Sequence, residues 1–512
     1  MSQLEEEVFN IVKELIPFSN FSNDTNLVKI GLHSILLLEL SMKIYQKYQI
    51  DILENNLLKD DNFTIRNIAK IISNNEENKL LIDYKENKND YYPLKKNQLG
   101  IYLEQIKKTE TTEYNIPFLI KFKKKTKIQD LVDKIFYFHP YLNSTIQTKN
   151  NEILLKKNNN NVIDVETIFV DDEHFLEDKI RQDLIKPFTL DEGSNLYRAY
   201  NIETNMSSCL FLDINHILFD GASIHPFIKT INKILNKDNE IIVDDIAFYS
   251  NYLENRKINS KNYDEQTVFY RDLLKNIDSV SELLDKKHNN NNDGRVLISI
   301  DKKKFDVFCE DNKISESNLL LAVYLYVISK YSLENDVLIS MITSSKTPLF
   351  EDSIGMFANT LPFPITINTN KTIKKFLQEV RDRALDINSN DLYSVLDLKE
   401  DYGYQTTIAY NYRHEQLNTH KIMNKEIKGF VDFTSDNFNY SFDLILNIDL
   451  IDNMYKLEFQ HSNRYSNELL KSFTATYQNI LEYITSTKNI NIKLDNVQFI
   501  SKKDEIILID KL

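Results

Sequence analysis

Apolar residues in the first part of the chain recur at the spacing of helices that bury one face. The spacing predicts a helix over Glu5–Leu15, a second from Ser34 to about Tyr48, and a last one over residues 65–73 that Thr64 can cap. A polar loop separates the first helix from the second. Three or four short helices of this kind can enclose one small core, so residues 1–76 are predicted to form a small all-α bundle.

The rest of the chain mixes helical and strand-like patterns. Residues 77–92 are charged and rich in Asn, without sustained periodicity, which is typical of a linker. The Asn-rich tracts at 158–161 and 289–292 are predicted to be solvated loops. Short apolar runs of the kind that form buried strands recur at Phe118–Phe122, Cys209–Ile214 and Val337–Ile342. The larger region is therefore predicted to combine helices and strands.

One stretch, Ser207–Leu235, combines a strand, a short polar loop and a helix. The strand ends just before His216, and the loop also carries Asp220 and Gly221. After the loop, apolar residues return at helical spacing, at Ile224, Phe227, Ile228, Ile231 and Leu235. Without further evidence, a lone histidine in such a loop is more often structural than catalytic.

Composition narrows the class of protein. The chain has 512 residues, of which 42% are hydrophobic, 11% aromatic and 27% charged, a globular composition long enough for roughly two to four domains. It contains no run of about 18 apolar residues that could cross a bilayer, and its acidic start lacks the basic region of a secretory signal. We therefore expect a cytoplasmic protein.

Charge and cysteine content argue against several kinds of partner and site. The net charge of −14 argues against nucleic acid or an anionic membrane as the main partner. The two cysteines, Cys209 and Cys309, are too few for a disulfide framework or a zinc site. No metal is expected, and both thiols are predicted to be buried.

The central loop and a second motif resemble those of one enzyme family. The loop N-H-I-L-F-D-G, Asn215–Gly221, resembles the HHxxxDG signature of condensation domains from nonribosomal peptide synthetases. The segment SIGMFANTLPF, Ser353–Phe363, closely resembles their GxFVNTLP motif. The segment KKNQLGIY is similar to their opening SxAQxRLW motif, keeping Gln98 but placing Gly100 at the arginine. Three looser matches follow in the order of the family. They are FHPYLNST, which keeps His139 and Leu142; the aromatic segments FYSNY and FYRDL; and YSFDLILNI at Tyr440–Ile448.

The resemblance implies an α/β fold like that of chloramphenicol acetyltransferase, with two lobes in a V and a tunnel between them. The condensation domain would comprise an N-lobe over residues 93–265 and a C-lobe over residues 266–512, joined to the helical module by the linker over 77–92. The active loop would lie in the tunnel, where the pantetheine arms of two carriers meet.

The N-terminal helices resemble an acyl or peptidyl carrier protein (thiolation) domain. In that family the serine of a G-x-x-S turn carries 4′-phosphopantetheine, and the matching residue is Ser34 at the end of GLHS. A serine at the first position of a helix keeps its hydroxyl outside the packed face, and a helix N-terminus favours an attached phosphate. The alternative is an ordinary helix-capping serine. His33 stands where the family usually has an aspartate.

The resemblance also assigns chemistry to the loop, because His216 matches the catalytic second histidine of the motif. Unperturbed imidazole has a pKa of about 6.5 and an α-amino group one of about 7.7–8.0, so an amine nucleophile does not require a strong general base. We expect His216 mainly to align the amine and stabilise the developing charge. Gly221 is expected either to offer its N–H to the oxyanion or simply to permit the turn.

Other residues are expected to shape the loop. Asn215 replaces the first histidine and cannot titrate, so activity survives if that position only braces the loop and is slowed or lost if it shares in proton handling. Asp220 is expected to hold the loop, and Lys346 is its candidate partner where the family uses an arginine. Ser223 is predicted to cap the following helix rather than to act as a nucleophile.

Three functions are consistent with these residues. The first is a carrier–condensation pair that joins a donor acyl or peptidyl group to an aminoacyl acceptor through an amide bond, or through an ester if the acceptor is a hydroxyl. The second is a carrier–epimerization pair, which the absence of Trp and the GMFANTLPF segment disfavour. The third is a non-catalytic, condensation-like docking platform.

The resemblance implies partners as well. They are an acceptor carrier, an adenylation domain and a phosphopantetheinyl transferase, acting in trans or on neighbouring modules. No adenylation domain is recognised in the chain, which ends shortly after the last condensation motif, so we expect either an excised fragment or a docking subunit. The fused carrier is expected to be the donor.

Overall fold

The structure is a computed structural model that places most of the chain. The described residues are 2–16, 21–30, 32, 34–48, 50, 52, 63–74, 84, 89–158, 163–171, 175–238, 242–285, 293–413, 424–434, 442–486 and 490–497. Several sequence features therefore lie outside the described residues, namely His33, most of the predicted linker, residues 159–161 and 289–292 of the Asn-rich tracts, Tyr440, and the chain after residue 497.

The N-terminal module contains the predicted helices. They are α1 (Gln3–Leu15), α2 (Ser34–Tyr48) and α3 (Ile65–Asn74), with a short 3₁₀ turn η1 (Val28–Ile30) before α2. Ser2 caps α1 in a reciprocal capping box with Glu5. Thr64 Oγ1 accepts a hydrogen bond from Asn67 N at 3.3 Å, which confirms its predicted capping role. The apolar faces enclose one core, whose fully buried members include Val8, Val12, Leu40, Ile44 and Ile68.

The larger region forms two lobes. The strands of the first lobe are β1 (Tyr91–Pro93), β2 (Asn115–Phe122), β3 (Ser144–Lys149), β4 (Glu152–Lys157), β5 (Val165–Phe169), β6 (Tyr197–Glu203), β7 (Ser208–Asn215) and, from late in the chain, β12 (Ile427–Asp432). Its helices and turns are α5 (Lys96–Gln105), α6 (Ile128–Phe138), η3 (Pro140–Asn143), α7 (Leu176–Lys179), η5 (Ile180–Leu184), η6 (Gly221–Ser223), α8 (Ile224–Asn236) and α9 (Ala247–Ile258).

The second lobe follows in the sequence. Its strands are β8 (Gly294–Asp301), β9 (Asp336–Ser344), β10 (Ala358–Thr366), β11 (Ile408–Arg413), β13 (Leu444–Ile451) and β14 (Met454–His461). Its helices and turns are α10 (Lys261–Leu274), α11 (Lys303–Asn312), α12 (Glu316–Ser332), η7 (Pro348–Phe350), α13 (Ile373–Asn388), α14 (Val395–Tyr402), α16 (Asn467–Ser486) and η8 (Leu494–Asn496).

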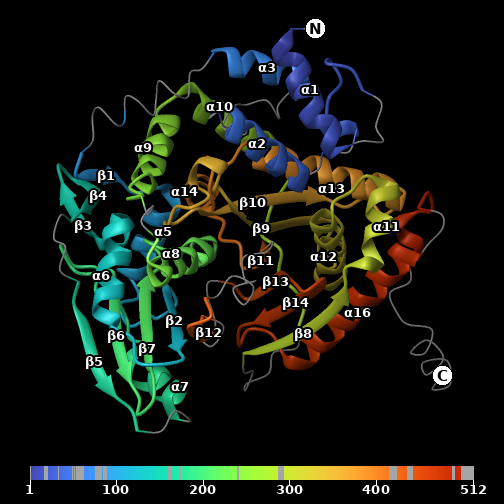
Figure 1. Ribbon diagram of the computed structural model, residues 1–512. Coiled ribbons are helices and arrows are strands. Elements are labelled where there is room, and N and C mark those ends of the chain that lie inside the picture. Colours follow the sequence, from blue (N-terminus) through green and yellow to red (C-terminus); the bar gives the residue numbers. More distant parts are fainter. Residues whose placement is uncertain are drawn as a thin grey trace.

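Two mixed sheets organise these lobes. The first lobe is built on a five-stranded sheet in the order β12-β2-β7-β6-β5, and the second on a six-stranded sheet in the order β10-β9-β11-β13-β14-β8 (Figure 1). A three-stranded sheet, β1-β4-β3, accompanies the first lobe. This two-lobed α/β architecture, preceded by a helical module, confirms the fold class expected from the resemblance.

Strand β12 crosses between the lobes. It follows β11 of the second lobe in the sequence, yet it pairs antiparallel with β2 of the first lobe, with Phe430 opposite Ile120. The ring of Phe430 stacks on that of Phe118 with centroids 5.6 Å apart. The first lobe therefore completes its sheet only with a strand that the chain supplies after most of the second lobe.

Helix α12 lies at the centre of the second lobe. Most of its residues are buried, including an unbroken run from Asn318 to Ser329, which identifies a helix surrounded by protein on all sides. Tyr324 and Tyr326 are both 0% exposed within this core. Of the helices that the structure describes, none is long and apolar enough to span a bilayer.

Strand β7 carries the predicted active loop at its end. It lies between β2 and β6, and all of its residues are buried, so apolar side chains occupy both of its faces instead of alternating with exposed polar ones. Its polar residues Asp213 and Asn215 are buried as well. The helix that follows the loop, α8, begins at Ile224. The predicted strand, loop and helix over Ser207–Leu235 are thus confirmed, as are the buried thiols of Cys209 and Cys309.

The predicted linker is anchored near its middle. Tyr84 is 3% exposed, and its ring contacts those of Tyr92, Tyr249 and Tyr252 at centroid distances of 5.0 to 6.2 Å. Strand β1 begins at Tyr91, inside the predicted linker range of 77–92. These aromatic contacts attach the chain to the first lobe before its first strand begins.

A charged residue, Asp213, is buried within β7. Its side chain is 0% exposed, and Oδ2 accepts hydrogen bonds from Asn115 Nδ2 at 2.7 Å and Arg198 Nη1 at 3.0 Å. Oδ1 has no hydrogen-bond partner among the described residues. Burial raises the pKa of Asp213 to about 7, because the charge of Arg198 and these hydrogen bonds offset only part of the lost hydration.

The substitution Asp213→Asn should change how folding stability depends on pH. An unfolded aspartate has a pKa of about 3.9, whereas the pKa of Asp213 in the folded state is about 7. Between these two values the folded state binds more protons than the unfolded state, so the free energy of unfolding falls as the pH rises. Asparagine does not titrate, so the part of the pH dependence that comes from Asp213 should disappear. Urea denaturation between about pH 4.5 and about pH 7.5 measures the free energy of unfolding across this range. Equal slopes in the two proteins would contradict the assignment.

The substitution Phe219→Ala should strongly destabilise the first lobe. Phe219 is 0% exposed, and its ring centroid lies 5.7 Å from that of Phe118 and 6.1 Å from that of Phe227. The cavity left should lower the free energy of unfolding by about 3–5 kcal/mol. Phe169→Ala is the control, since that ring is 78% exposed and its loss should change stability by about 0.5 kcal/mol or less. Similar midpoints of urea denaturation for both variants would refute the proposed packing.

Candidate active site

Asn215 closes strand β7 and braces the loop that follows. Its side chain is 0% exposed, its Nδ2 donates to Gln105 Oε1 at 2.9 Å, and its Oδ1 accepts from Ile217 N at 3.0 Å. Both ends of the amide are therefore used in hydrogen bonds within the protein. These contacts match the bracing role that the sequence left open for this position.

His216 is held in place by its backbone. Its N–H donates to Tyr114 O at 2.8 Å. The residue is partly buried, and its Nδ1 has no hydrogen-bond partner within the described part of the chain. Buried polar atoms are normally paired, so this nitrogen stands out among the polar atoms of the loop.

Asp220 joins the active loop to the second motif. It is 2% exposed, and its Oδ2 accepts hydrogen bonds from Phe357 N and Ala358 N, each at 2.7 Å. Its Oδ1 lies 3.2 Å from Ser223 Oγ. Two backbone N–H groups thus compensate the buried carboxylate, and these contacts support the expectation that Asp220 holds the loop.

The expected pairing of Lys346 with Asp220 is replaced by another arrangement. Lys346 Nζ donates to the carbonyl oxygens of Ala222 and Ser353, both at 2.9 Å. Burial lowers the pKa of Lys346 to about 8, although the charge of Asp220 acts in the opposite direction. The lysine therefore braces the same two segments through their carbonyls, because the N–H groups of Phe357 and Ala358 already serve the carboxylate.

Ser223 and Gly221 form the short turn η6 ahead of α8. Ser223 occupies the N-cap position of α8, as predicted, but its side chain makes no capping hydrogen bond. Its Oγ instead donates to Gly355 O at 2.7 Å and accepts from Gly355 N at 3.0 Å. Among the described glycines, those with positive φ are Gly193 and Gly403. Gly221 therefore does not need the left-handed conformation that favours glycine.

The opening motif meets the loop through Gln98, which is fully buried. Its Nε2 donates to Ile217 O at 2.7 Å and to Tyr141 OH at 2.8 Å, and its Oε1 accepts from Asn251 Nδ2 at 2.7 Å. The retained glutamine of the motif therefore fixes the carbonyl next to His216. Sequence reasoning recognised the residue but assigned it no contact.

Sequence reasoning missed the neighbours of Gln98. Asn97 contacts the side chain of Asn359, whose Nδ2 donates to Asp391 O at 2.6 Å. Lys95 Nζ donates to Met356 O at 2.9 Å. The available signal was that Lys95 and Asn97 stand at the serine and alanine positions of the similar SxAQ motif.

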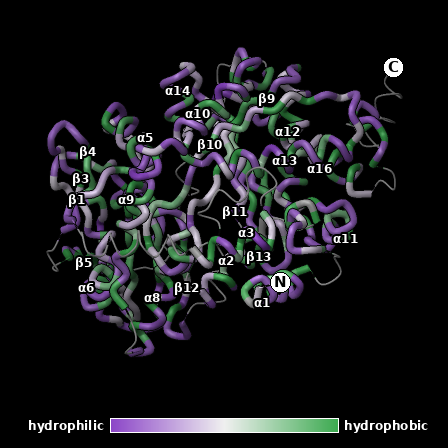
Figure 2. Tube along the Cα trace, turned by 90° about the horizontal axis from the view of Figure 1, so that it is seen from above, coloured by the Kyte–Doolittle hydropathy of each residue, from purple (hydrophilic) through white to green (hydrophobic). Residues whose placement is uncertain are grey.

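Ser34 begins helix α2, as predicted, and its side chain is not described. The first turn of this 15-residue helix contains no acidic residue, so its free N–H groups suit a phosphate attached at this end. Helix α2 contacts η7, and Leu385 of α13 packs against the core of the helical module. Seen from above, this module lies over the junction between the two lobes (Figure 2).

Protein-family models match both parts of the chain. A condensation-domain model matches residues 88–506, and a phosphopantetheine attachment-site model matches residues 6–72. The second match supports 4′-phosphopantetheine as the covalent cofactor of the helical module.

Several curated relatives align with nearly the whole chain. Bacitracin synthase 1 of Bacillus licheniformis is 22% identical over 99% of this chain but only 10% of its own length. Gramicidin S synthase 2 of Brevibacillus brevis is 22% identical over 98% of this chain and 12% of its own length. The chain therefore spans about a tenth of the length of these synthetases.

Solved structures share the fold at low sequence identity. The condensation domain from the Monacolin K polyketide synthase MokA aligns with a TM-score of 0.66 and 14% identity, covering 79% of this chain and 99% of that domain. The X-domain from teicoplanin biosynthesis aligns with a TM-score of 0.68 and 13% identity, covering 81% of this chain and 99% of that domain. With its helical module and its two motifs, the chain is a carrier–condensation didomain of the nonribosomal peptide synthetase type and belongs to the condensation-domain family.

Proposed function

We propose that this chain is an acyltransferase that forms peptide bonds within a nonribosomal peptide synthetase. The carrier would present an acyl or peptidyl thioester as donor, and the condensation domain would join it to an aminoacyl group on a separate acceptor carrier. The observation that carries the proposal is the buried Nδ1 of His216, which has no partner among the described residues and lies in a loop that Asn215, Asp220 and Gln98 hold in place.

The chemistry requires alignment more than a strong base. The amine nitrogen of the acceptor forms a C–N bond with the thioester carbonyl carbon, and the C–S bond breaks. The proton lost by the amine neutralises the departing thiolate. The attached 4′-phosphopantetheine would supply the sulfur of the thioester and a long, flexible arm that carries the acyl group. His216 would align the amine and accept its hydrogen bond, and the N–H of Gly221 is the candidate donor to the carbonyl oxygen.

We propose the division expected from the sequence, with a carrier over residues 1–76, a linker over 77–92, an N-lobe over 93–265 and a C-lobe over 266–512. The elements depart from these bounds in three places: β1 begins at Tyr91, α10 (Lys261–Leu274) spans the break at 265, and β12 (Ile427–Asp432) joins the sheet of the first lobe. Separate hydrophobic cores within the carrier and the two lobes support this division. The acceptor carrier, an adenylation domain and a phosphopantetheinyl transferase would be supplied in trans or by neighbouring modules, and the cytoplasm stays the predicted compartment.

Replacement of the attachment serine should abolish loading of the carrier. Incubation with a phosphopantetheinyl transferase and coenzyme A should add one phosphopantetheine arm to the wild-type chain and none to Ser34→Ala, because the hydroxyl is the acceptor. Intact-mass spectrometry measures the gain. Ser73→Ala is the control, since this exposed serine lies on α3 and should not affect loading. Loading of Ser34→Ala would show that another residue is modified.

Replacement of the loop histidine should slow amide formation without preventing loading. With a loaded donor and an aminoacyl acceptor carrier, His216→Ala should reduce the single-turnover rate by about 10²- to 10⁴-fold, the usual contribution of such a group. His225→Ala is the matched control, because that histidine is exposed on α8 and faces away from the core. An unchanged rate in His216→Ala would remove this residue from the mechanism. Absence of peptide with the wild-type chain would instead favour a non-catalytic platform.

A further inference from the structure

The turn between β9 and β10 belongs to the second lobe in sequence but packs into the core of the first lobe. Phe350, Ile354, Met356 and Phe357 all lie in the hydrophobic cluster of the first lobe. This turn also provides the N–H groups of Phe357 and Ala358 that bind Asp220. Its position relative to the first lobe therefore decides where the active loop is held.

Lys95, at the start of α5, holds one side of this turn. It is 6% exposed, its Nζ donates to Met356 O at 2.9 Å, and the same ammonium lies 4.6 Å from the ring centroid of Phe357. Lys346 approaches the same ring at 5.5 Å. Cation–π contacts of this kind strengthen when the cation is removed from water, as it is here for Lys95.

Asn97 holds the other side of the turn. Its Nδ2 contacts the side-chain oxygen of Asn359 and lies 3.4 Å from Ala358 O. The two N–H groups that bind Asp220 are thus flanked by one residue held by Lys95 and another held by Asn97.

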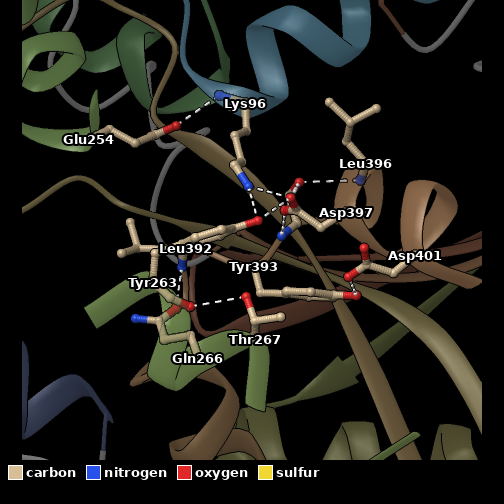
Figure 3. A network of polar contacts seen from close by, with 11 residues as sticks. Lys96, Glu254, Tyr263, Gln266, Thr267, Leu392, Tyr393, Leu396, Asp397 and Asp401 are labelled. Carbon is tan, nitrogen blue, oxygen red and sulfur yellow. Dashed lines mark hydrogen bonds and ion pairs between the residues drawn. The ribbon is translucent and has the colours of Figure 1, made fainter. Parts of the chain in front are cut away.

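Lys96, between them, connects α5 to two helices of the second lobe. Its Nζ forms an ion pair with Asp397 of α14 and lies 2.5 Å from Tyr263 OH of α10, which itself donates to Asp397 Oδ1 at 2.7 Å (Figure 3). The Lys96 and Asp397 side chains are only 17% and 6% exposed, and the backbone N–H of Lys96 donates to Glu254 Oε1 at 2.8 Å. Partial burial and the shared tyrosine distinguish this pair from ordinary surface ion pairs.

We propose that Lys95, Lys96 and Asn97 form an inter-lobe clasp, and that they are positioning residues for the reaction proposed above. Lys96 would fix the separation of the lobes through Asp397 and Tyr263, while its two neighbours seat the turn that binds Asp220. The clasp acts on His216 only through this turn and loop, so it touches neither substrate nor the reacting atoms. The inference rests on the proposed function for its effect on rate, but its effect on lobe geometry is independent of that function.

The first test is kinetic and uses the full holo chain with a loaded donor and an aminoacyl acceptor carrier. Lys96→Ala should lower kcat by about 10- to 100-fold, the cost expected when a reacting group is misplaced by about 1 Å, with KM for the acceptor changed by about twofold or less. Lys96→Arg should restore most of the rate, because a guanidinium can still bind Asp397. Lys229→Ala is the control: its partner is Asp352, the two groups lie 2.6 Å apart across the same lobes, and the side chains are 41% and 60% exposed.

The second test reads lobe geometry without any reaction. Tyr137→Cys in the first lobe and Leu297→Cys in the second introduce exposed thiols for spin labels, and the native Cys209 and Cys309 are buried. Double electron–electron resonance should show a broadened or lengthened inter-lobe distance in Lys96→Ala. Lys96→Arg and Lys229→Ala should keep the wild-type distribution.

Each outcome decides the proposal. An unchanged distance distribution in a folded Lys96→Ala protein overturns the clasp, whatever the rate does. A changed distribution with an unchanged rate overturns the positioning role alone. If Lys96→Ala fails to fold, Tyr263→Phe removes one hydroxyl from the network and should give the same changes at smaller size. If the wild-type chain forms no peptide, the proposed function fails while the distance measurement still tests the clasp.

Discussion

The structure depends on one buried carboxylate that joins two distant segments. Asp220, in the NHILFDG loop, accepts hydrogen bonds from the N–H groups of Phe357 and Ala358, which lie in the SIGMFANTLPF segment. Because an uncompensated charge in this position would be costly, the loop and the turn are stable only together. The position of His216 is thus a property of the junction between lobes rather than of its own loop.

Several further hydrogen bonds surround this carboxylate. Ser223 exchanges hydrogen bonds with the backbone of Gly355, Lys346 donates to the carbonyls of Ala222 and Ser353, and Gln98 donates to the carbonyl of Ile217. These bonds end on backbone atoms, so they fix the path of the chain around the carboxylate. Within the part of the chain that the structure describes, this arrangement leaves Nδ1 of His216 without a hydrogen-bond partner.

The sequence predicted the local elements well, because their signals are local. The helix over Ser34–Tyr48 and the strand that carries the loop follow from periodicity and from a buried apolar run, and both are found where expected. The family motifs also brought Asn215, His216, Asp220 and Gly221 into one loop. These predictions needed only residues close together in the chain.

The partners of these residues could not be predicted in the same way. Lys346 was expected to pair with Asp220, but it binds two backbone carbonyls instead. Which of these partners it meets depends on the position of the turn between β9 and β10, and the periodicity of the sequence does not encode that position. The contacts of Lys95, Lys96 and Asn97 join residues about 260 to 300 positions apart. Likewise, nothing local in β12 indicates that it pairs with β2.

The crossing of β12 has a consequence for biosynthesis. About 300 residues separate β2 from β12, the strand that pairs with it at the edge of the sheet. At a synthesis rate of about 5–20 residues per second, the ribosome needs roughly 15–60 s to supply that strand. During this interval β2 lacks one neighbour in its sheet, and an exposed strand edge favours pairing with other chains. Nascent first lobes are therefore the stage at which we expect the greatest need for chaperones.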